Sequence, residues 1–275
     1  MQACYRVWGV NAKLSASDPG LWEELLKIVP PDWSSVTDPV PPIHFRVESR
    51  SVGGFQLLFN DSLIPCASWL PGVLEELRGR IHIEVAQRVR IACFVHAGVV
   101  GIGHGALVIP GPTFHGKSSL VRSLVAAGAR FFSDEFAVIT PDGLVHSYPR
   151  AMSIRTENGR KEYYSAADLG WEPGQGPLPL RWIAAIRYLE GSDWDCRALS
   201  KAQGFLTLYE NSVAGTTAPI ETFRILTSAV KSCSVIQGTR GDVREAVPAL
   251  QKWIDQENYA RSLAGSGTTT LNPKT

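Results

Sequence analysis

The fold of this chain is decided by residues 106–118, which read Ala106-Leu107-Val108-Ile109-Pro110-Gly111-Pro112-Thr113-Phe114-His115-Gly116-Lys117-Ser118. The first five residues are a short apolar run, which is typical of a buried strand. Residues 117–127 follow with apolar side chains at helical spacing, and Gly128 stands where a helix would end. The stretch therefore predicts a strand, a glycine-containing loop and a helix in immediate succession.

The loop follows the Walker A pattern G-x-x-x-x-G-K-S. In this pattern, backbone N–H groups of the loop and of the helix N-terminus point at phosphate oxygens. Lys117 adds a positive charge for the β- and γ-phosphates, and the hydroxyl of Ser118 is a ligand for Mg²⁺. We therefore expect this loop to bind ATP with Mg²⁺. The expected binding residues are Gly111, Pro112, Thr113, Phe114, His115, Gly116, Lys117, Ser118 and Ser119.

The interior of the loop carries unusual residues for such a site. Pro112 has no N–H to donate, which removes one potential phosphate contact. Phe114 is large where many such loops have small residues, and it either packs against the domain or faces the ligand. His115 either touches a phosphate or is solvated. These residues favour an alternative in which the chain binds nucleotide without transferring a phosphoryl group.

Composition excludes several other classes of protein. The chain has 275 residues, 44% of them hydrophobic and 19% charged, so it can bury a core without disulfides. Its formal net charge of +1 gives no reason to expect nucleic acid or a membrane as partner. It has no apolar run long enough for a transmembrane helix and no signal-peptide pattern. Its five cysteines are scattered, which indicates reduced thiols, and we expect a cytoplasmic protein.

The chain is expected to contain two structured parts and a tail. Residues 1–90 form a small N-terminal α+β region, residues 91–258 an α/β nucleotide-binding domain, and residues 259–275 a flexible tail. The N-terminal region is expected to hold a strand within 1–10, helices over 21–28 and 73–90, and a hairpin of 43–47 with 55–59. The second part is expected to add strands at 91–95, 136–139, 144–146, 182–189 and 233–236 and helices at 219–230 and 242–255.

An acidic residue must complete a phosphate site, either by holding Mg²⁺ through water or by accepting a proton from the substrate. Asp134 follows Ser118 by sixteen residues, so a single helix carries the chain from the loop to this acid. The sequence contains no N-K-x-D motif and no L-S-G-G-Q signature. These absences weigh against a GTPase and against a transporter ATPase.

The motifs around the loop resemble those of the HPr kinase/phosphorylase group and its relatives, over roughly residues 91–156. The resemblance implies a P-loop α/β fold, similar to the C-terminal domain of HPr kinase and to the ATP-dependent phosphoenolpyruvate carboxykinases. It also implies ATP and Mg²⁺ as ligands, phosphoryl transfer to a serine hydroxyl, and a homo-oligomer. The motifs that carry it are Val95-His96-Ala97-Gly98-Val99-Val100, Ala106-Leu107-Val108-Ile109-Pro110-Gly111, Gly116-Lys117-Ser118-Ser119-Leu120, Ala127-Gly128-Ala129-Arg130 and Ser133-Asp134-Glu135.

The resemblance also assigns roles by position. The first acid of the family's pair is the general base toward the acceptor hydroxyl, and a strand histidine pairs with it; these are Asp134 and His96 here. A neighbouring His can orient such a carboxylate and tune its pKa. With Lys117 they are the expected catalytic residues, while Ser118 and Glu135 are the expected metal ligands. The structural alternatives are a satisfied histidine at a strand end and an acidic turn residue.

Downstream, the sequence departs from the bifunctional enzymes of that group. It offers Arg150 and Arg155 as phosphate clamps and Glu157 as a metal ligand, without the glycine-rich signature of those enzymes. The leading expectation is an ATP-dependent kinase whose acceptor is a serine on a protein or peptide, or a small-molecule alcohol. The alternatives are a non-catalytic regulatory or assembly module that binds nucleotide, and a slow ATPase.

Overall fold

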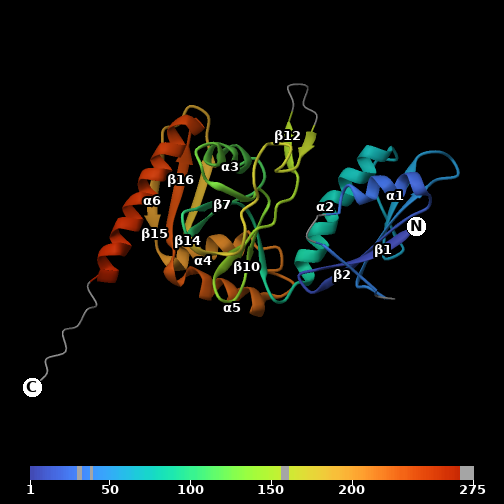
Figure 1. Cartoon of the computed structure of the whole chain (residues 1–275), viewed down its shortest axis with the longest axis horizontal. Coiled ribbons are helices and arrows are strands. Elements are labelled where there is room, and N and C mark those ends of the chain that lie inside the picture. The colour runs from blue at the N-terminus through green and yellow to red at the C-terminus, as the bar shows by residue number, and fades with distance from the viewer. Residues whose placement is uncertain (30–32, 38–39, 156–160, 267–275) are drawn as a thin grey trace, which may run out of the picture. The chain divides into compact units, whose positions relative to one another are not determined.

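The computed structural model describes residues 1–29, 33–37, 40–155 and 161–266 (Figure 1). Over these residues the chain is a mixed α/β protein with six α-helices and three β-sheets. It divides into two compact units, of which the first comprises Met1–Phe94 and Val213–Thr222, and the second Val95–Ser212 and Phe223–Thr275. The first unit thus takes in a short segment from late in the chain, which the expected division at residue 90 did not include.

The first unit is built on a six-stranded sheet with the order β3-β1-β2-β4-β5-β6. Helix α2 packs on β4 and β5. The expected hairpin is confirmed, since β4 and β5 pair antiparallel. The expected N-terminal strand is a hairpin of two strands, which turns at Trp8 and Gly9 with positive φ. The elements are β1 (Gln2–Val7), β2 (Val10–Ala16), α1 (Pro19–Leu26), β3 (Ser34–Val36), β4 (Ile43–Ser49), β5 (Phe55–Phe59), β6 (Ser62–Ile64) and α2 (Leu70–Arg88).

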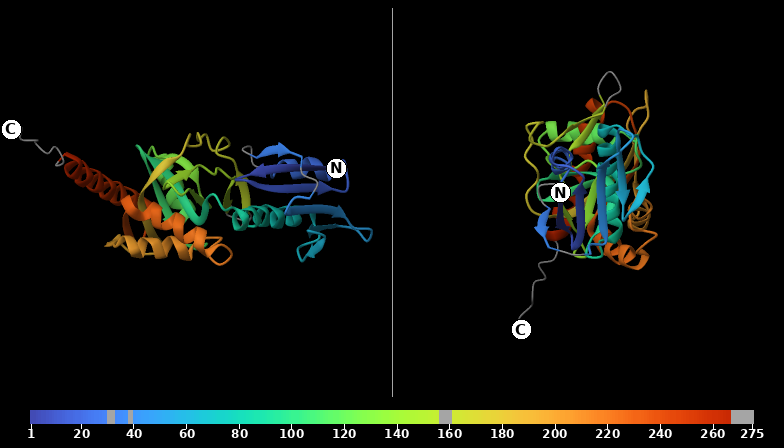
Figure 2. Two further views of the ribbon diagram at one scale, coloured as in Figure 1. Left: turned by 90° about the horizontal axis from the view of Figure 1, so that it is seen from below. Right: turned by 90° about the vertical axis from the view of Figure 1, so that its right-hand side faces the viewer.

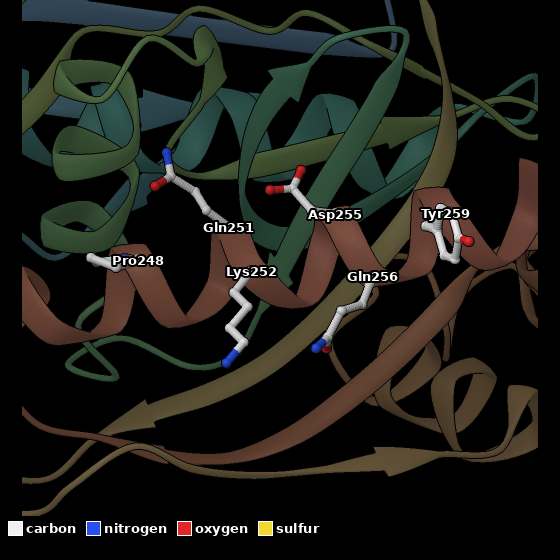
Figure 3. A pocket seen from close by; sticks show the side chains of 6 residues that line it. All are labelled: Pro248, Gln251, Lys252, Asp255, Gln256 and Tyr259. Carbon is white, nitrogen blue, oxygen red and sulfur yellow. The ribbon is translucent and has the colours of Figure 1, made fainter.

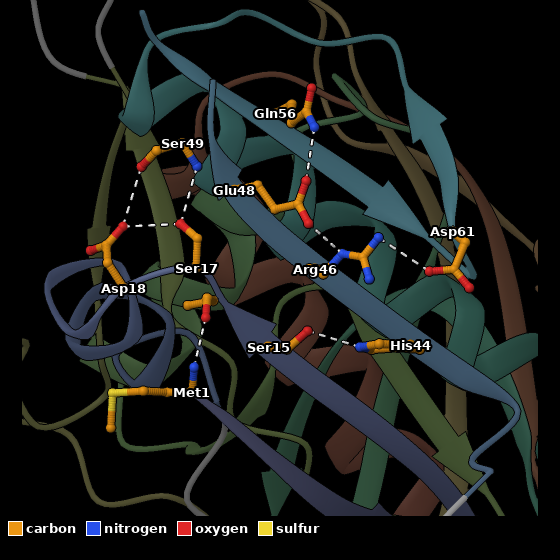
Figure 4. Close-up of polar contacts among 11 residues, drawn as sticks. Met1, Ser15, Ser17, Asp18, His44, Arg46, Glu48, Ser49, Gln56 and Asp61 are labelled. Carbon is orange, nitrogen blue, oxygen red and sulfur yellow. Dashed lines mark hydrogen bonds and ion pairs between the residues drawn. The ribbon is translucent and has the colours of Figure 1, made fainter. Parts of the chain in front are cut away.

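Polar contacts in the first unit join neighbouring strands and cap a helix (Figure 4). Asp18 caps α1 by accepting the Leu21 N–H at 3.0 Å, and it also accepts from Ser49. Arg46 pairs with Glu48 at 2.7 Å and with Asp61 at 3.2 Å. The Arg46 and Asp61 side chains are 35% and 76% exposed, so these charges neutralise each other close to water.

The second unit is built on an eight-stranded sheet with the order β11-β10-β7-β8-β14-β16-β15, to which β9 adds beside β7. The strands β8, β14 and β16 run parallel, so their carboxyl ends meet at one edge. The long helix α6 of this unit is drawn in red in Figure 2. Helices α3 and α6 pack together over the core. The strands are β7 (Cys93–Ile102), β8 (Gly105–Pro110), β9 (Arg130–Ser133), β10 (Phe136–Ile139), β11 (Leu144–His146), β14 (Leu178–Tyr188), β15 (Asp195–Leu199) and β16 (Ser234–Arg240).

The remaining elements of the second unit surround this sheet. Strands β12 (Met152–Arg155) and β13 (Lys161–Tyr164) form a separate antiparallel pair. Helix α4 packs on β16 and was not expected from the sequence, although a capping box of Ser200 and Gln203 marks its start. The helices are α3 (Lys117–Ala126), α4 (Lys201–Glu210), the short 3-10 helix η1 (Val230–Ser232) and α6 (Val243–Ser266). Helix α5 (Pro219–Ala229) belongs to both units, because its residues 219–222 are part of the first.

Helix α6 overturns part of the expected tail. The expected domain ended at residue 258, whereas the helix continues to Ser266. Arg261 explains the difference, because its guanidinium donates to the Arg181 carbonyl and to the Ser234 hydroxyl, both at 2.9 Å. Residues 267–275 lie outside the described residues. All five cysteines are free thiols, and none of the described helices is long and apolar enough to cross a membrane.

Candidate functional site

The expected succession of strand, loop and helix is present. Strand β8 is buried along its whole length and ends at Pro110, and α3 begins at Lys117. We call residues 111–118 the glycine loop. It leaves the sheet at the edge where β14 also ends, because β8 and β14 are parallel. Gly111 starts the loop with a φ of 151°, and its N–H donates to the His96 carbonyl at 3.3 Å.

Gly116 is the position in the loop with the strictest steric demand. Its φ of 76° is left-handed, and a Cβ there would lie 2.7 Å from Arg240 Nη2 and 2.8 Å from Tyr188 Cβ. Only glycine meets both conditions without a shift of its neighbours. The final turn of the loop is therefore pressed against the carboxyl ends of β14 and β16.

Arg240 is a site residue that the sequence did not reveal. Its side chain is 2% exposed, and its Nη2 donates to the Gly116 carbonyl at 2.7 Å and to Ser119 Oγ at 3.3 Å. Nη1 donates to the Gly241 carbonyl at 2.8 Å, while Nε is buried with no hydrogen-bond partner. Burial lowers the pKa of Arg240. The one available signal was a basic residue at the end of a strand.

Lys117 is the second buried cation at the loop. It is 6% exposed, and its Nζ donates to the Pro112 carbonyl at 2.9 Å. Burial lowers the pKa of Lys117, while the nearby Glu135 and Asp134 carboxylates raise it. Because the N-terminus of α3 carries partial positive charge as well, this end of the loop favours an anion.

The other side chains of the loop are more open. Phe114 has a φ of 71°, and its side chain is 79% exposed. Pro112 and Thr113 are exposed, and His115 is half-buried. Burial lowers the pKa of His115, and Lys117 and Arg187 lower it further, which favours a neutral ring.

Asp134 lies against the loop serine, as its spacing from Ser118 predicts. The carboxyl is 8% exposed, and its Oδ2 accepts from Ser118 Oγ at 3.3 Å. Burial raises the pKa of Asp134 to about 7, and the neighbouring Glu135 adds to the rise. The turn that carries both acids is fixed by the buried Ser133, whose hydroxyl accepts the N–H groups of Glu135 and Phe136 at 3.2 and 3.1 Å.

His96 lies beside Glu135, the second acid of the pair, and its expected pairing with Asp134 stays a prediction. His96 Nε2 lies 3.8 Å from Glu135 Oε1, and Arg150 Nη1 lies 3.7 Å from the other carboxylate oxygen. The cause is backbone register, because the Ala97 N–H donates to the Glu135 carbonyl at 3.0 Å and so sets residue 135 beside β7. Burial lowers the pKa of His96, and Lys117 lowers it further.

The same geometry bears on the expected metal ligands, Ser118 and Glu135, which stay a prediction. Glu135 lies between His96 and Arg150, whereas Asp134 is the acid that contacts Ser118. Among the described residues no group of three His, Cys, Asp or Glu side chains could hold a metal ion alone. Mg²⁺ needs only one or two protein oxygens when phosphates and water complete its shell. Ser118 and Asp134 fit that requirement, and a cation beside Asp134 would favour the ionised carboxylate, whose pKa is raised first by burial and then by the charge of Glu135. Glu157 and the side chain of Arg155 lie outside the described residues.

Among the described residues, two clefts that adjoin the glycine loop stand out. The first, of about 590 Å³, is lined by Gly111 and His115 together with residues of α4, β14, β15 and β16. The second, of about 520 Å³, is lined by Gly116, Tyr188 and Arg240 among others. A further groove follows α6, and all of its lining residues come from that one helix and none from the loop (Figure 3). This groove is an open face of one helix, and none of the loop residues proposed to bind phosphate lines it.

No protein-family model matches this sequence, and no curated protein matches it either. The resemblance to the HPr kinase/phosphorylase group thus rests on the motifs and on the contacts of the residues that form them. Those contacts bring Lys117, Ser118 and Asp134 together at one end of the loop. Chemically, the arrangement combines a buried ammonium, a hydroxyl and a carboxyl with a pKa near neutrality, all beside the N-terminus of a helix.

Proposed function

We propose that the glycine loop is a P-loop that binds the phosphates of ATP with Mg²⁺, and that the chain is an ATP-dependent kinase. The acceptor is a hydroxyl group, and the resemblance to the HPr kinase group favours a serine of a protein or peptide. The observation that carries the proposal is the contact of Asp134 with Ser118, because it joins a buried carboxyl of pKa about 7 to the loop.

Charge supports phosphate as the ligand of the loop. Lys117 and Arg240 are both buried, and no carboxylate among the described residues forms an ion pair with either. Burying a cation without an ion pair is unfavourable unless an anion offsets the cost. The N–H groups at the start of α3 attract the same anion. A phosphate chain on the loop would satisfy all three groups.

Asp134 supports phosphoryl transfer beyond binding. A general base works best when its pKa lies near the working pH, and that of Asp134 is raised to about 7. As the acceptor oxygen forms its bond to the γ-phosphorus, the bond from phosphorus to the bridging oxygen breaks, and the acceptor proton passes to Asp134. Lys117 offsets the charge on the phosphoryl oxygens. Ser118, and Asp134 through water, would hold Mg²⁺, which supplies further charge neutralisation when bound.

His96, Glu135 and Arg150 have a supporting role in this proposal. Glu135 raises the pKa of Asp134 by its charge, and Arg150 lowers it. His96 and Arg150 fix Glu135 from two sides, at 3.8 and 3.7 Å. This set therefore tunes the proton affinity of the base and holds the second acid away from Ser118.

Incubation with γ-labelled ATP, Mg²⁺ and serine-containing acceptors tests the kinase. The expected result is label on a serine hydroxyl, lost in Lys117→Met and in Asp134→Asn. A matched control is Lys13→Met, which removes a lysine from β2 of the first unit and leaves labelling unchanged. Label found only as free phosphate indicates the slow ATPase, and label on a small alcohol indicates a metabolite kinase.

A nucleotide-binding module that transfers nothing is the second candidate. Pro112 removes one N–H from the loop, and the exposed ring of Phe114 offers a contact surface next to it. In that case ATP binds with Mg²⁺, yet no acceptor is labelled and Asp134→Asn leaves every measured property of the bound complex unchanged. Retention of a buried acid with a raised pKa favours the kinase.

A further inference from the structure

The second cleft at the loop, which we call the Arg240 cleft, has no role in the transfer step itself. It is bounded by the end of the loop, by the segment after β14 and by the segment after β16. Its volume is about 520 Å³, which is enough for a small organic group. The residues that matter here are Gly116, Ser119, Tyr188, Asp193, Arg240 and Asp242.

Arg240 is buried in this cleft without an ion pair to any carboxylate of the described residues, although Asp193, Asp242 and Glu245 also line the cleft and the charge of Asp242 acts on Arg240. Its guanidinium donates to three uncharged oxygens, namely the Gly116 and Gly241 carbonyls and the Ser119 hydroxyl. Its Nε has no partner, and its guanidinium lies 5.4 Å from the centre of the Tyr188 ring. A guanidinium that is only 2% exposed and forms no ion pair favours the binding of an anion beside it.

The order of the strands gives a bound nucleotide its direction. Strand β8, which leads into the loop, lies between β7 on one side and β14 and β16 on the other. Asp134 follows β9, which pairs with β7, whereas Tyr188 and Arg240 end β14 and β16. A phosphate chain with its terminal group near Asp134 therefore has its nucleoside end above β14 and β16, at the carboxyl ends of parallel strands, where α/β sheets bind ligands.

Of the two clefts on that side, the Arg240 cleft suits a nucleoside better. It touches Ser119, the residue directly after the expected Mg²⁺ ligand, and Tyr188, whose side chain is 42% exposed and offers a ring for stacking. The exposed carboxylates of Asp193 and Asp242 are acceptors for ribose hydroxyls. The other cleft has no Phe, Tyr or Trp in its lining, and its aromatic ring is the smaller imidazole of His115.

Resting on the proposed function, we propose that the Arg240 cleft binds the ribose and base of the nucleotide. The base stacks on Tyr188, and Arg240 faces the phosphate next to the ribose. Arg240 also fixes the Gly116 carbonyl, so it positions the loop while it receives the ligand. This site makes the protein select a nucleoside triphosphate over a bare polyphosphate.

Calorimetric titration with Mg²⁺ and either ATP or inorganic tripolyphosphate tests this assignment. Wild-type protein is expected to bind ATP at least about tenfold more tightly than tripolyphosphate, because base stacking on an aromatic side chain commonly contributes that much. Tyr188→Ala lowers the ATP affinity about tenfold and leaves the tripolyphosphate affinity within about twofold. Tyr188→Phe keeps the ring and keeps ATP affinity, which shows that the Ala variant acts through stacking. Circular dichroism checks that each variant is folded.

Arg197→Met, in the lining of the other cleft, is the matched control, and it leaves both affinities unchanged. A selective loss of ATP affinity in Arg197→Met, with none in Tyr188→Ala, puts the nucleoside in that cleft and overturns the proposal. Equal affinity of wild-type protein for ATP and tripolyphosphate, both lost in Lys117→Met, overturns the nucleoside cleft and leaves the phosphate loop standing. If wild-type protein binds neither, both proposals are wrong.

Discussion

The charged residues of the two units differ in where they lie and in how they are paired. In the first unit, Arg46 has two carboxylate partners and stands 35% exposed. In the second, Lys117, Asp134 and Arg240 are all under 10% exposed, at 6%, 8% and 2%. Exposed pairs contribute at most about 1 kcal/mol to stability, and buried charges without ion pairs cost free energy. Among the described residues of the second unit, the charged side chains under 9% exposed all lie at the glycine loop, which points to a ligand there.

The largest expected effect comes from Asp134→Asn. The amide keeps the shape of the carboxyl and cannot take up the acceptor proton, so phosphoryl transfer is expected to fall about 10²- to 10⁴-fold. Initial rates of label transfer measure the effect. In the wild type the rate is expected to rise with pH through about 7, as Asp134 loses its proton. A variant that transfers at the wild-type rate removes Asp134 from the role of base.

The second prediction concerns the fit of the loop against β14 and β16. Gly116→Ala places a methyl group 2.7 Å from Arg240 Nη2 at a φ of 76°. We expect a loss of about 2 to 4 kcal/mol of unfolding free energy and of measurable ATP binding. The matched control is Gly128→Ala, with a φ of 97° and no atom within 4 Å of the new Cβ. That variant costs only about 1 to 2 kcal/mol in urea unfolding and keeps ATP binding. Equal losses in both would mean that the Arg240 contact is unimportant.

The third prediction is that Asp134→Asn stabilises the fold while it removes activity. Asp134 has its pKa raised from 3.8 to about 7 in the folded chain, so its proton stabilises the fold in acid, and that stability is lost as the pH rises through 7. The Asn variant escapes this loss. Its melting temperature should match that of the wild type near pH 4 and exceed it near pH 8, by the equivalent of about a few kcal/mol. A melting temperature of the Asn variant below that of the wild type near pH 8 would contradict the prediction, because it would show that neighbouring groups stabilise the ionised Asp134 carboxylate.

The loop was predictable from the sequence because it is local. The apolar run before Gly111 and the helical spacing after Lys117 decide the strand and the helix without distant contacts. The sixteen-residue step from Ser118 to Asp134 also spans a single helix, and the two side chains do meet. The loop and the contact of Asp134 with Ser118 could therefore be predicted, because the residues concerned lie close together in the sequence.

The features that could not be predicted from the sequence depend on contacts between residues far apart in the chain. The neighbour of His96 depends on how the turn after β9 sits against β7, and that register sets Glu135 beside His96. Arg240 is 124 residues from Gly116 in the chain, so no local pattern could connect them. The end of α6 depended likewise on contacts of Arg261 with Arg181 and Ser234.

The smallest expected effect is in the first unit. Arg46→Ala removes both exposed ion pairs and is expected to cost at most about 1 kcal/mol, less at high salt, with ATP binding unchanged. Urea unfolding at low and high salt measures this. A cost of several kcal/mol that salt does not reduce would show that charge in the first unit is as consequential as charge at the loop.

The central claim is that the glycine loop binds nucleotide phosphates. Equilibrium titration of wild-type protein and of Lys117→Met with ATP and Mg²⁺, run side by side, tests it most directly. We predict saturable binding to the wild type and at least about a 100-fold loss of affinity in the variant, since a buried charge-assisted contact is removed. Absence of binding to folded wild-type protein, or equal binding by both proteins, would contradict it.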